Sequence, residues 1–62
     1  MTPRELAVLR SLADGLTNQE IAARMSISKR TVDSHLSNVY VKIGVANRAK
    51  AVAFALRNGL AE

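Results

Sequence analysis

The stretch TNQEIAARMSISKRTVDSHLSNVYVKIG, residues 17–44, decides the fold of this chain. Thr17 is followed three residues later by Glu20, the spacing of a capping box, in which each side chain bonds to the backbone of the other residue. Apolar side chains then recur at helical spacing. We therefore expect a short helix over residues 18–25, followed by a turn in which Ile27 can seal the junction.

A longer helix follows that turn. Ser28 has the short hydroxyl side chain that caps helix N-termini, and Gly44 supplies the left-handed residue that commonly follows a helix C-terminus. These two signals predict a helix over residues 29–43. Two helices joined by so short a turn are typical of a helix-turn-helix, whose usual partner is DNA.

The longer helix divides into an apolar face and a largely polar face. At about 100° per residue, its large apolar side chains fall on one side, and mostly short or polar side chains fall opposite or beside them. A slim face on a helix about 22 Å long fits the major groove of B-DNA, which is about 12 Å wide. The expected buried residues are Val32, Leu36, Val39, Tyr40 and Ile43, and the expected exposed residues are Arg30, Asp33, Ser34, Ser37, Asn38 and Val41.

Two further helices flank this unit. Thr2 and Glu5 form another capping box with a proline between them, which predicts a helix over residues 3–14. Asn47 can cap a helix over residues 48–58, which a glycine follows. The expected fold class is therefore all-α, a compact four-helix domain that contains a helix-turn-helix.

The last helix carries more apolar surface than its own domain can bury. Residues 51–56 read AVAFAL, so apolar side chains face in every direction. A helix on the outside of a small domain buries only one face within the fold. Alanine can also be present merely because it is the best helix former. Of these two explanations, we favour a partner for the second face.

The composition excludes more functions than it specifies. The 62 residues carry a formal charge of +4 and include one histidine and no cysteine. Disulfides, thiolate zinc sites and a cysteine nucleophile are therefore excluded, and we expect neither an enzyme nor a metal, cofactor or small-molecule ligand. The positive charge favours a polyanionic partner, and no apolar run approaches the ~20 residues of a membrane span.

Five segments, taken in order, resemble one family. They are TPRE at 2–5, LADGLTNQEIAARMSIS at 12–28, TVDSHLSNVYVKIGV at 31–45, NRAKAV at 47–52 and GL at 59–60. Over practically its whole length, residues 1–62, the chain is similar to the LuxR-type (GerE-like) DNA-binding domain of bacterial transcription regulators. The resemblance implies a cytoplasmic domain at the C-terminus of a larger regulator, which binds double-stranded DNA sequence-specifically to regulate transcription.

The resemblance also implies roles for individual residues. The helix over 29–43 would enter the major groove, and the last helix would join two copies on two-fold sites; RNA polymerase is a further candidate partner. Helix N-termini, with free N–H groups and a positive dipole end, suit phosphate for independent physical reasons. The implied base-reading residues are Asp33, Ser34, Ser37 and Asn38; the phosphate contacts are Thr17, Asn18, Gln19, Ser28, Lys29, Arg30, Thr31, His35 and Lys42; and the dimer contacts are Ala49, Ala53, Phe54 and Leu56.

Two positions depart from the family's pattern. Ala7 stands where the opening motif usually has glutamate, so we expect a structural salt bridge to be missing. Asp33 stands where many members carry lysine. Its carboxylate would be repelled by phosphates, yet it can accept a hydrogen bond from the N4 amino group of cytosine. Asp33 is thus either a base selector or a weakness in affinity, and the sequence leaves both interpretations open.

Two other functions fit parts of the sequence. The last helix-turn-helix of a sigma factor shares the opening motif and the EIA...S..TV pattern, but it usually ends near the recognition helix, whereas this chain continues. A protein-interaction module would instead use the apolar last helix, and Asp33 is its best support. His35 lacks partners for a catalytic or metal role, so we expect it to pack or to contact phosphate.

Overall fold

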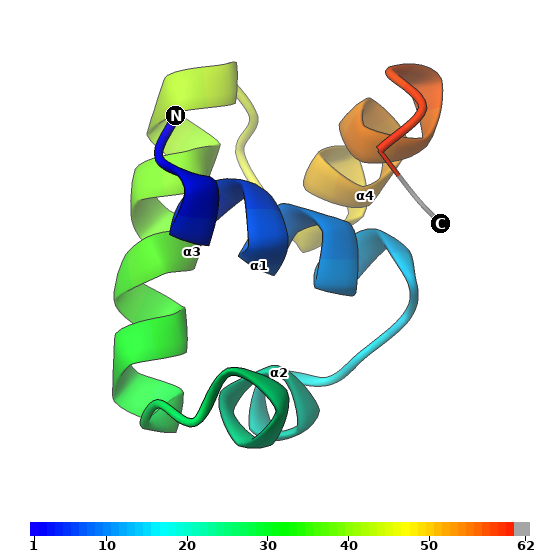
Figure 1. Cartoon of the computed structure of the whole chain (residues 1–62). Coiled ribbons are helices and arrows are strands. Elements are labelled where there is room, and N and C mark those ends of the chain that lie inside the picture. The colour runs from blue at the N-terminus through cyan, green and yellow to red at the C-terminus, as the bar shows by residue number, and fades with distance from the viewer. Residues whose placement is uncertain (61–62) are drawn as a thin grey trace.

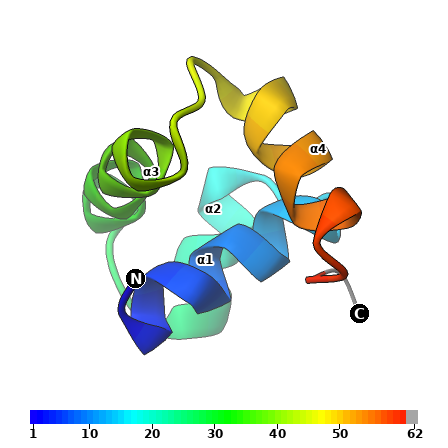
Figure 2. The same cartoon turned by 90° about the horizontal axis from the view of Figure 1, so that it is seen from above.

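The computed structural model describes residues 1–60, and the secondary structure of this part of the chain is entirely helical. The elements are α1 (Pro3–Ala13), α2 (Asn18–Met25), α3 (Lys29–Ile43) and α4 (Arg48–Arg57). Figures 1 and 2 show α1 between α3 on one side and α4 on the other, with α2 lying across one end of α3. Because α1 packs against each of the other three helices, it is the centre of the fold.

The capping boxes begin α1 and α2 as the sequence predicts. The hydroxyls of Thr2 and Thr17 accept from the N–H groups of Glu5 and Glu20, at 3.1 and 3.2 Å. The two glutamate carboxylates accept in return from the threonine N–H groups, at 2.9 and 2.8 Å. Each box therefore satisfies two N–H groups that have no acceptor within the helix.

The other predicted helix boundaries agree to within one residue. Ser28 and Asn47 cap α3 and α4 with their side chains. Gly44 has a φ of 72° and ends α3 in the left-handed conformation. α1 and α4 each end one residue before the predicted position, because Asp14 and Asn58 are the C-cap residues rather than the last helical ones.

The turn of the helix-turn-helix is built on Ser26. Its φ of 56° and ψ of 41° place it in the left-handed region, and among the described residues no other non-glycine residue has a positive φ. This conformation ends α2 after Met25 and allows the N–H of Ile27 to donate to the carbonyl of Ala22 at 3.0 Å. Ile27 then packs against the core at the junction of α2 and α3, as predicted.

The core draws on all four helices. The predicted apolar face of α3 is confirmed, since its central residues are buried and Tyr40 and Ile43 pack at its edge. From α4 the core takes small residues, which lets that helix approach α1 closely. Each fully buried leucine or isoleucine contributes about 1.5–3 kcal/mol. The buried apolar residues are Val8, Leu9, Leu12, Ile21, Ala22, Val32, Leu36, Val39, Ala51 and Ala55.

An ion pair fastens α1 to the end of α3. The Lys42 Nζ atom lies 2.6 Å from the Oε1 atom of Glu5, whose residue is only 4% exposed. The hydrogen bond from Lys42, followed by that from the Thr2 N–H, lowers the pKa of Glu5 from 4.5 to about 2. Ala7 offers no carboxylate, so the salt bridge expected of a glutamate at this position cannot form. The ion pair between Glu5 and Lys42 is a separate contact between α1 and α3.

Candidate nucleic-acid interface

The polar face of α3 stands free of the hydrophobic core, as predicted. Ser34 and Ser37, the short side chains at its centre, are both exposed. Val41, further along the same face, is 82% exposed. No part of α4 covers this surface, so the whole face is accessible to a ligand. Its exposed residues are Arg30, Asp33, Ser34, Ser37, Asn38 and Val41.

The start of α3 offers donors to an anion. The Oγ atom of Ser28 accepts from the Thr31 N–H at 3.0 Å and also lies 2.8 Å from the Thr31 hydroxyl. These bonds leave the N–H groups of Lys29 and Arg30, the first two helical residues, without an intrahelical acceptor. Both side chains are exposed and basic, so side-chain charge, N–H groups and helix dipole all favour a phosphate here.

The start of α2 has the same character and lies beside α3. The capping box uses the N–H groups of Thr17 and Glu20, so those of Asn18 and Gln19 have no acceptor within the helix. Asn18 reaches α3 through its side chain, because its Nδ2 atom donates to Oδ1 of Asp33 at 2.8 Å. Two amide-rich helix starts therefore adjoin one exposed polar face.

Asn18 also connects this surface to α4. Its Oδ1 atom accepts from Nη1 of Arg48 at 2.6 Å, and Nη2 of Arg48 donates to the carbonyl of Leu16. Sequence reasoning assigned no function to Arg48. The one local signal was an arginine at the first position of a helix, where its charge opposes the dipole. The contacts span about 30 residues of sequence, so no local pattern predicts them.

Lys42 and His35, two of the predicted phosphate contacts, do not lie at the exposed helix starts. Lys42 lies in the last turn of α3, and its ammonium is paired with Glu5. His35 is half-buried, and its Nε2 atom is buried without a hydrogen-bond partner among the described residues. A contact of either residue with phosphate stays a prediction. Lys42 would have to share its charge with Glu5, and Nε2 of His35 is not accessible in this conformation.

The predicted dimer surface on α4 is largely exposed. Ala49 and Ala53 are exposed, and Leu56 is 56% exposed although it is a large apolar residue. Phe54 is half-buried and packs with Val52 against the core. Leu56 is therefore the large apolar residue of α4 that points outward.

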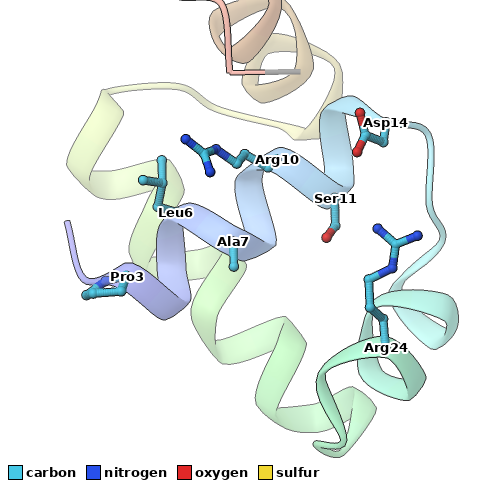
Figure 3. Close-up of a pocket in the computed structure, with 7 residues that line it drawn as sticks. All are labelled: Pro3, Leu6, Ala7, Arg10, Ser11, Asp14 and Arg24. Atoms are coloured by element: carbon cyan, nitrogen blue, oxygen red, sulfur yellow. The ribbon is translucent and has the colours of Figure 1, made fainter. Parts of the chain in front are cut away.

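A shallow hollow lies elsewhere on the molecule, between α1 and Arg24 of α2 (Figure 3). None of the residues that line it is among those predicted to contact DNA. Among the described residues, no group of histidine and acidic side chains has the arrangement of a metal site. None of the described helices has the length and apolarity needed to cross a membrane. The lining residues are Pro3, Leu6, Ala7, Arg10, Ser11, Asp14 and Arg24.

Sequence comparison relates this chain to transcription regulators. Residues 1–55 match the family described as bacterial regulatory proteins, luxR family. The chain is 57% identical over 53 residues to the probable transcriptional regulatory protein SgaR of Hyphomicrobium methylovorum, covering 86% of this chain and 25% of SgaR. It is 44% identical over 61 residues to the response regulator Rre1 of Synechocystis, covering 98% of this chain and 26% of Rre1. The chain thus spans about a quarter of the length of these relatives.

Solved structures give the same assignment. The transcription factor GerE superposes with a TM-score of 0.84 at 32% identity, over 100% of this chain and 92% of GerE. The response regulator ChrA of a heme-sensing two-component system superposes with a TM-score of 0.85 at 41% identity, over 95% of this chain and 29% of ChrA. The chain therefore belongs to the luxR family of bacterial regulatory proteins, as a helix-turn-helix DNA-binding domain.

Proposed function

We propose that this domain binds double-stranded DNA sequence-specifically and thereby regulates transcription, with α3 in the major groove. The observation that carries the proposal is the exposed polar face of α3, adjoined by the starts of α2 and α3. Short side chains at Ser34 and Ser37 permit close approach to base edges. The helix starts supply N–H donors that fix the helix against the phosphate backbone.

The proposal divides the contacts into two kinds. Lys29 and Arg30 bind phosphate, together with the helix starts, and supply affinity that does not depend on sequence. Ser34, Ser37 and Asn38 read base edges with hydroxyl and amide groups, and Asp33 reads an amino group. Gln19 contributes a backbone N–H that has no acceptor within the helix. Thr17, Ser28 and Thr31 contribute hydroxyl groups that also take part in capping, because the N–H groups of Thr17 and Thr31 already donate within the caps.

The proposal includes a dimer formed through α4. Exposed Ala49 and Ala53 allow two helices to approach closely, and Leu56 presents an apolar side chain to the same partner. Two recognition helices related by a two-fold axis would read half-sites about one helical turn apart. The relatives are about four times longer, so the remainder of a larger regulator would supply the signal, and RNA polymerase in the bacterial cytoplasm is the expected downstream partner.

Selection from a randomised duplex pool tests the proposal directly. The chain is expected to enrich a two-fold motif, and its affinity for that motif should exceed its affinity for random duplex by at least about 10³. Failure to bind any duplex at low salt would contradict the proposal. Binding of random and selected duplex with equal affinity would contradict sequence specificity.

Substitutions separate the two kinds of contact. Lys29→Ala is expected to weaken binding to selected and random duplex by the same factor, because it removes a phosphate contact. Ser37→Ala is expected to relax the preference at one position of the motif and to leave binding to random duplex almost unchanged. Fluorescence titrations of both variants on both duplexes measure these effects. An equal loss in both variants on both duplexes would contradict the proposed division.

A further inference from the structure

A hydrogen-bonded relay runs from α4 to the recognition helix. Arg48 donates through Nη1 to Oδ1 of Asn18, and Nδ2 of Asn18 donates to Oδ1 of Asp33, over distances of 2.6 and 2.8 Å. Arg48 offers only donors and an ionised Asp33 only acceptors, so these two partners fix the orientation of the Asn18 amide between them. The relay therefore has one direction, from the guanidinium to the carboxylate.

The relay restricts the side chains of the charged residues at its two ends, Arg48 and Asp33. Arg48 is half-buried, and its second nitrogen, Nη2, donates to the carbonyl of Leu16, so the planar guanidinium is fixed at two points. Asp33 is exposed and uses Oδ1 for Asn18, and no other hydrogen bond engages this carboxylate in the described part of the chain. Its second oxygen, Oδ2, is thereby available to a ligand in the groove.

The relay also changes the electrostatics of Asp33. A carboxylate close to phosphates is repelled, which would make Asp33 a liability on this surface. A charge-assisted bond to the carbonyl oxygen of Asn18 polarises its amide and strengthens the bond that the same amide donates to Asp33. The Arg48 guanidinium thus supports the hydrogen bond to Asp33 from the start of α4, without itself lying on the polar face of α3.

We infer that Arg48 and Asn18 are positioning residues that hold Asp33 as an oriented acceptor for the exocyclic amino group of a base, cytosine above all. This inference rests on the proposed function, and it makes Asp33 a base selector rather than a mere repulsive charge. It also means that the choice of base at one position depends on the first residue of α4, which lies outside the helix-turn-helix. A purely structural Arg48, by contrast, would only fasten α4 to the loop before α2.

Base preference separates the two roles. Selections from a randomised duplex pool are compared for the 62-residue chain and for its Asp33→Ala, Arg48→Ala and Asn18→Ala variants. Asp33→Ala identifies the position that Asp33 reads. At that position we expect Arg48→Ala and Asn18→Ala to lower the discrimination for cytosine by about fivefold or more, a substantial part of what one good base contact provides. In an Asp33→Ala background, Arg48→Ala should change this preference no further.

Lys50→Ala is the matched control. It removes the same charge from the same helix two residues later, and the side chain of Lys50 makes no hydrogen bond within the described residues. Lys50→Ala should therefore leave the preference for cytosine unchanged. Arg48→Lys keeps the charge without the planar fork and should recover part of the discrimination. If circular dichroism shows that Arg48→Ala is unfolded, Asn18→Ala and Arg48→Lys decide the question.

Failure of the inference can be told apart from failure of the proposed function. A chain that selects no motif at all overturns the proposed function. A chain that selects a motif whose preferences are unchanged by Asp33→Ala, or are changed by Asp33→Ala but not by Arg48→Ala and Asn18→Ala, overturns the inference alone. A loss of thermal stability with unchanged base preference would assign Arg48 the purely structural role.

Discussion

Ser26 shows how much one residue contributes to the geometry of the helix-turn-helix. Its left-handed φ of 56° ends α2 and turns the chain into α3. A residue with a Cβ atom adopts this conformation at a cost of roughly 1 kcal/mol, because Cβ approaches the following carbonyl oxygen. Ser26 is exposed and is not held by a side-chain hydrogen bond within the described residues, so the surrounding packing, Ile27 above all, maintains the conformation.

Replacing Ser26 with glycine should therefore stabilise the domain. We expect Ser26→Gly to raise the free energy of unfolding by roughly 0.5–1 kcal/mol, since relief of the positive φ outweighs the greater freedom of glycine in the unfolded chain. Ser26→Ala keeps the strain and should give no gain. Urea denaturation of the three proteins measures the difference, and a less stable Ser26→Gly variant would contradict this account.

At the scale of elements, local signals specified the helices, whereas long-range contacts did not follow from them. Thr2 and Thr17 could be assigned as caps because a capping box lies within four residues of sequence. The burial of Glu5 could not be predicted, because its partner Lys42 is 37 residues away. The contacts of Arg48 with Asn18 and Leu16 could not be predicted for the same reason. Exposure of the α3 face could be predicted, because helical periodicity alone separates its two sides.

The ion pair between α1 and α3 predicts how stability depends on pH. Lys42 and the Thr2 N–H lower the folded-state pKa of Glu5 to about 2 from an ordinary value of 4.5. The stabilisation is complete above about pH 5 and is lost as the pH falls toward 2. Urea denaturation at a series of pH values should show this loss.

The matched variant for that experiment is Glu5→Gln. It keeps an oxygen for the cap but carries no charge, so its stability should be lower at pH 7 and should fall less steeply below pH 5. Some fall will persist, because the Thr17 backbone N–H also lowers the pKa of Glu20. Equal pH dependence in the two proteins would show that the Glu5 pair does not contribute.

At the scale of the whole molecule, α1 packs against each of the other three helices. The two surfaces with proposed functions lie on two of those helices. The recognition face belongs to α3 and the dimer surface to α4. Leu56 is 56% exposed, so its removal costs the isolated fold little. We expect Leu56→Ser to change the free energy of unfolding by less than about 0.5 kcal/mol.

The same variant should bind a selected two-fold duplex about fivefold more weakly or worse, because an apolar contact between copies is lost. Binding to a duplex that carries a single half-site should be unchanged, which provides the control. Sedimentation of the complexes would count the chains on each duplex. Equal affinity of Leu56→Ser and the unsubstituted chain for the two-fold duplex would remove Leu56 from the dimer surface.

Salt dependence tests the electrostatic part of binding by the assembled dimer. If the dimer contacts five to eight phosphates, the slope of log affinity against log salt concentration should be roughly −5 to −7. Lys29→Ala should make the slope shallower by about one for each contact it removes. Fluorescence anisotropy across a range of salt concentrations measures the slope, and a flat dependence would contradict phosphate binding by the helix starts.

The Oε1 atom of Glu5 accepts from both the Thr2 N–H and Lys42 Nζ. One oxygen thus couples the N-cap of α1 to the last turn of α3, and a change at Glu5 alters both bonds together. Anyone grafting this domain onto a new sensor should keep Thr2 intact, since a junction that frays the first turn of α1 would also loosen the far end of α3.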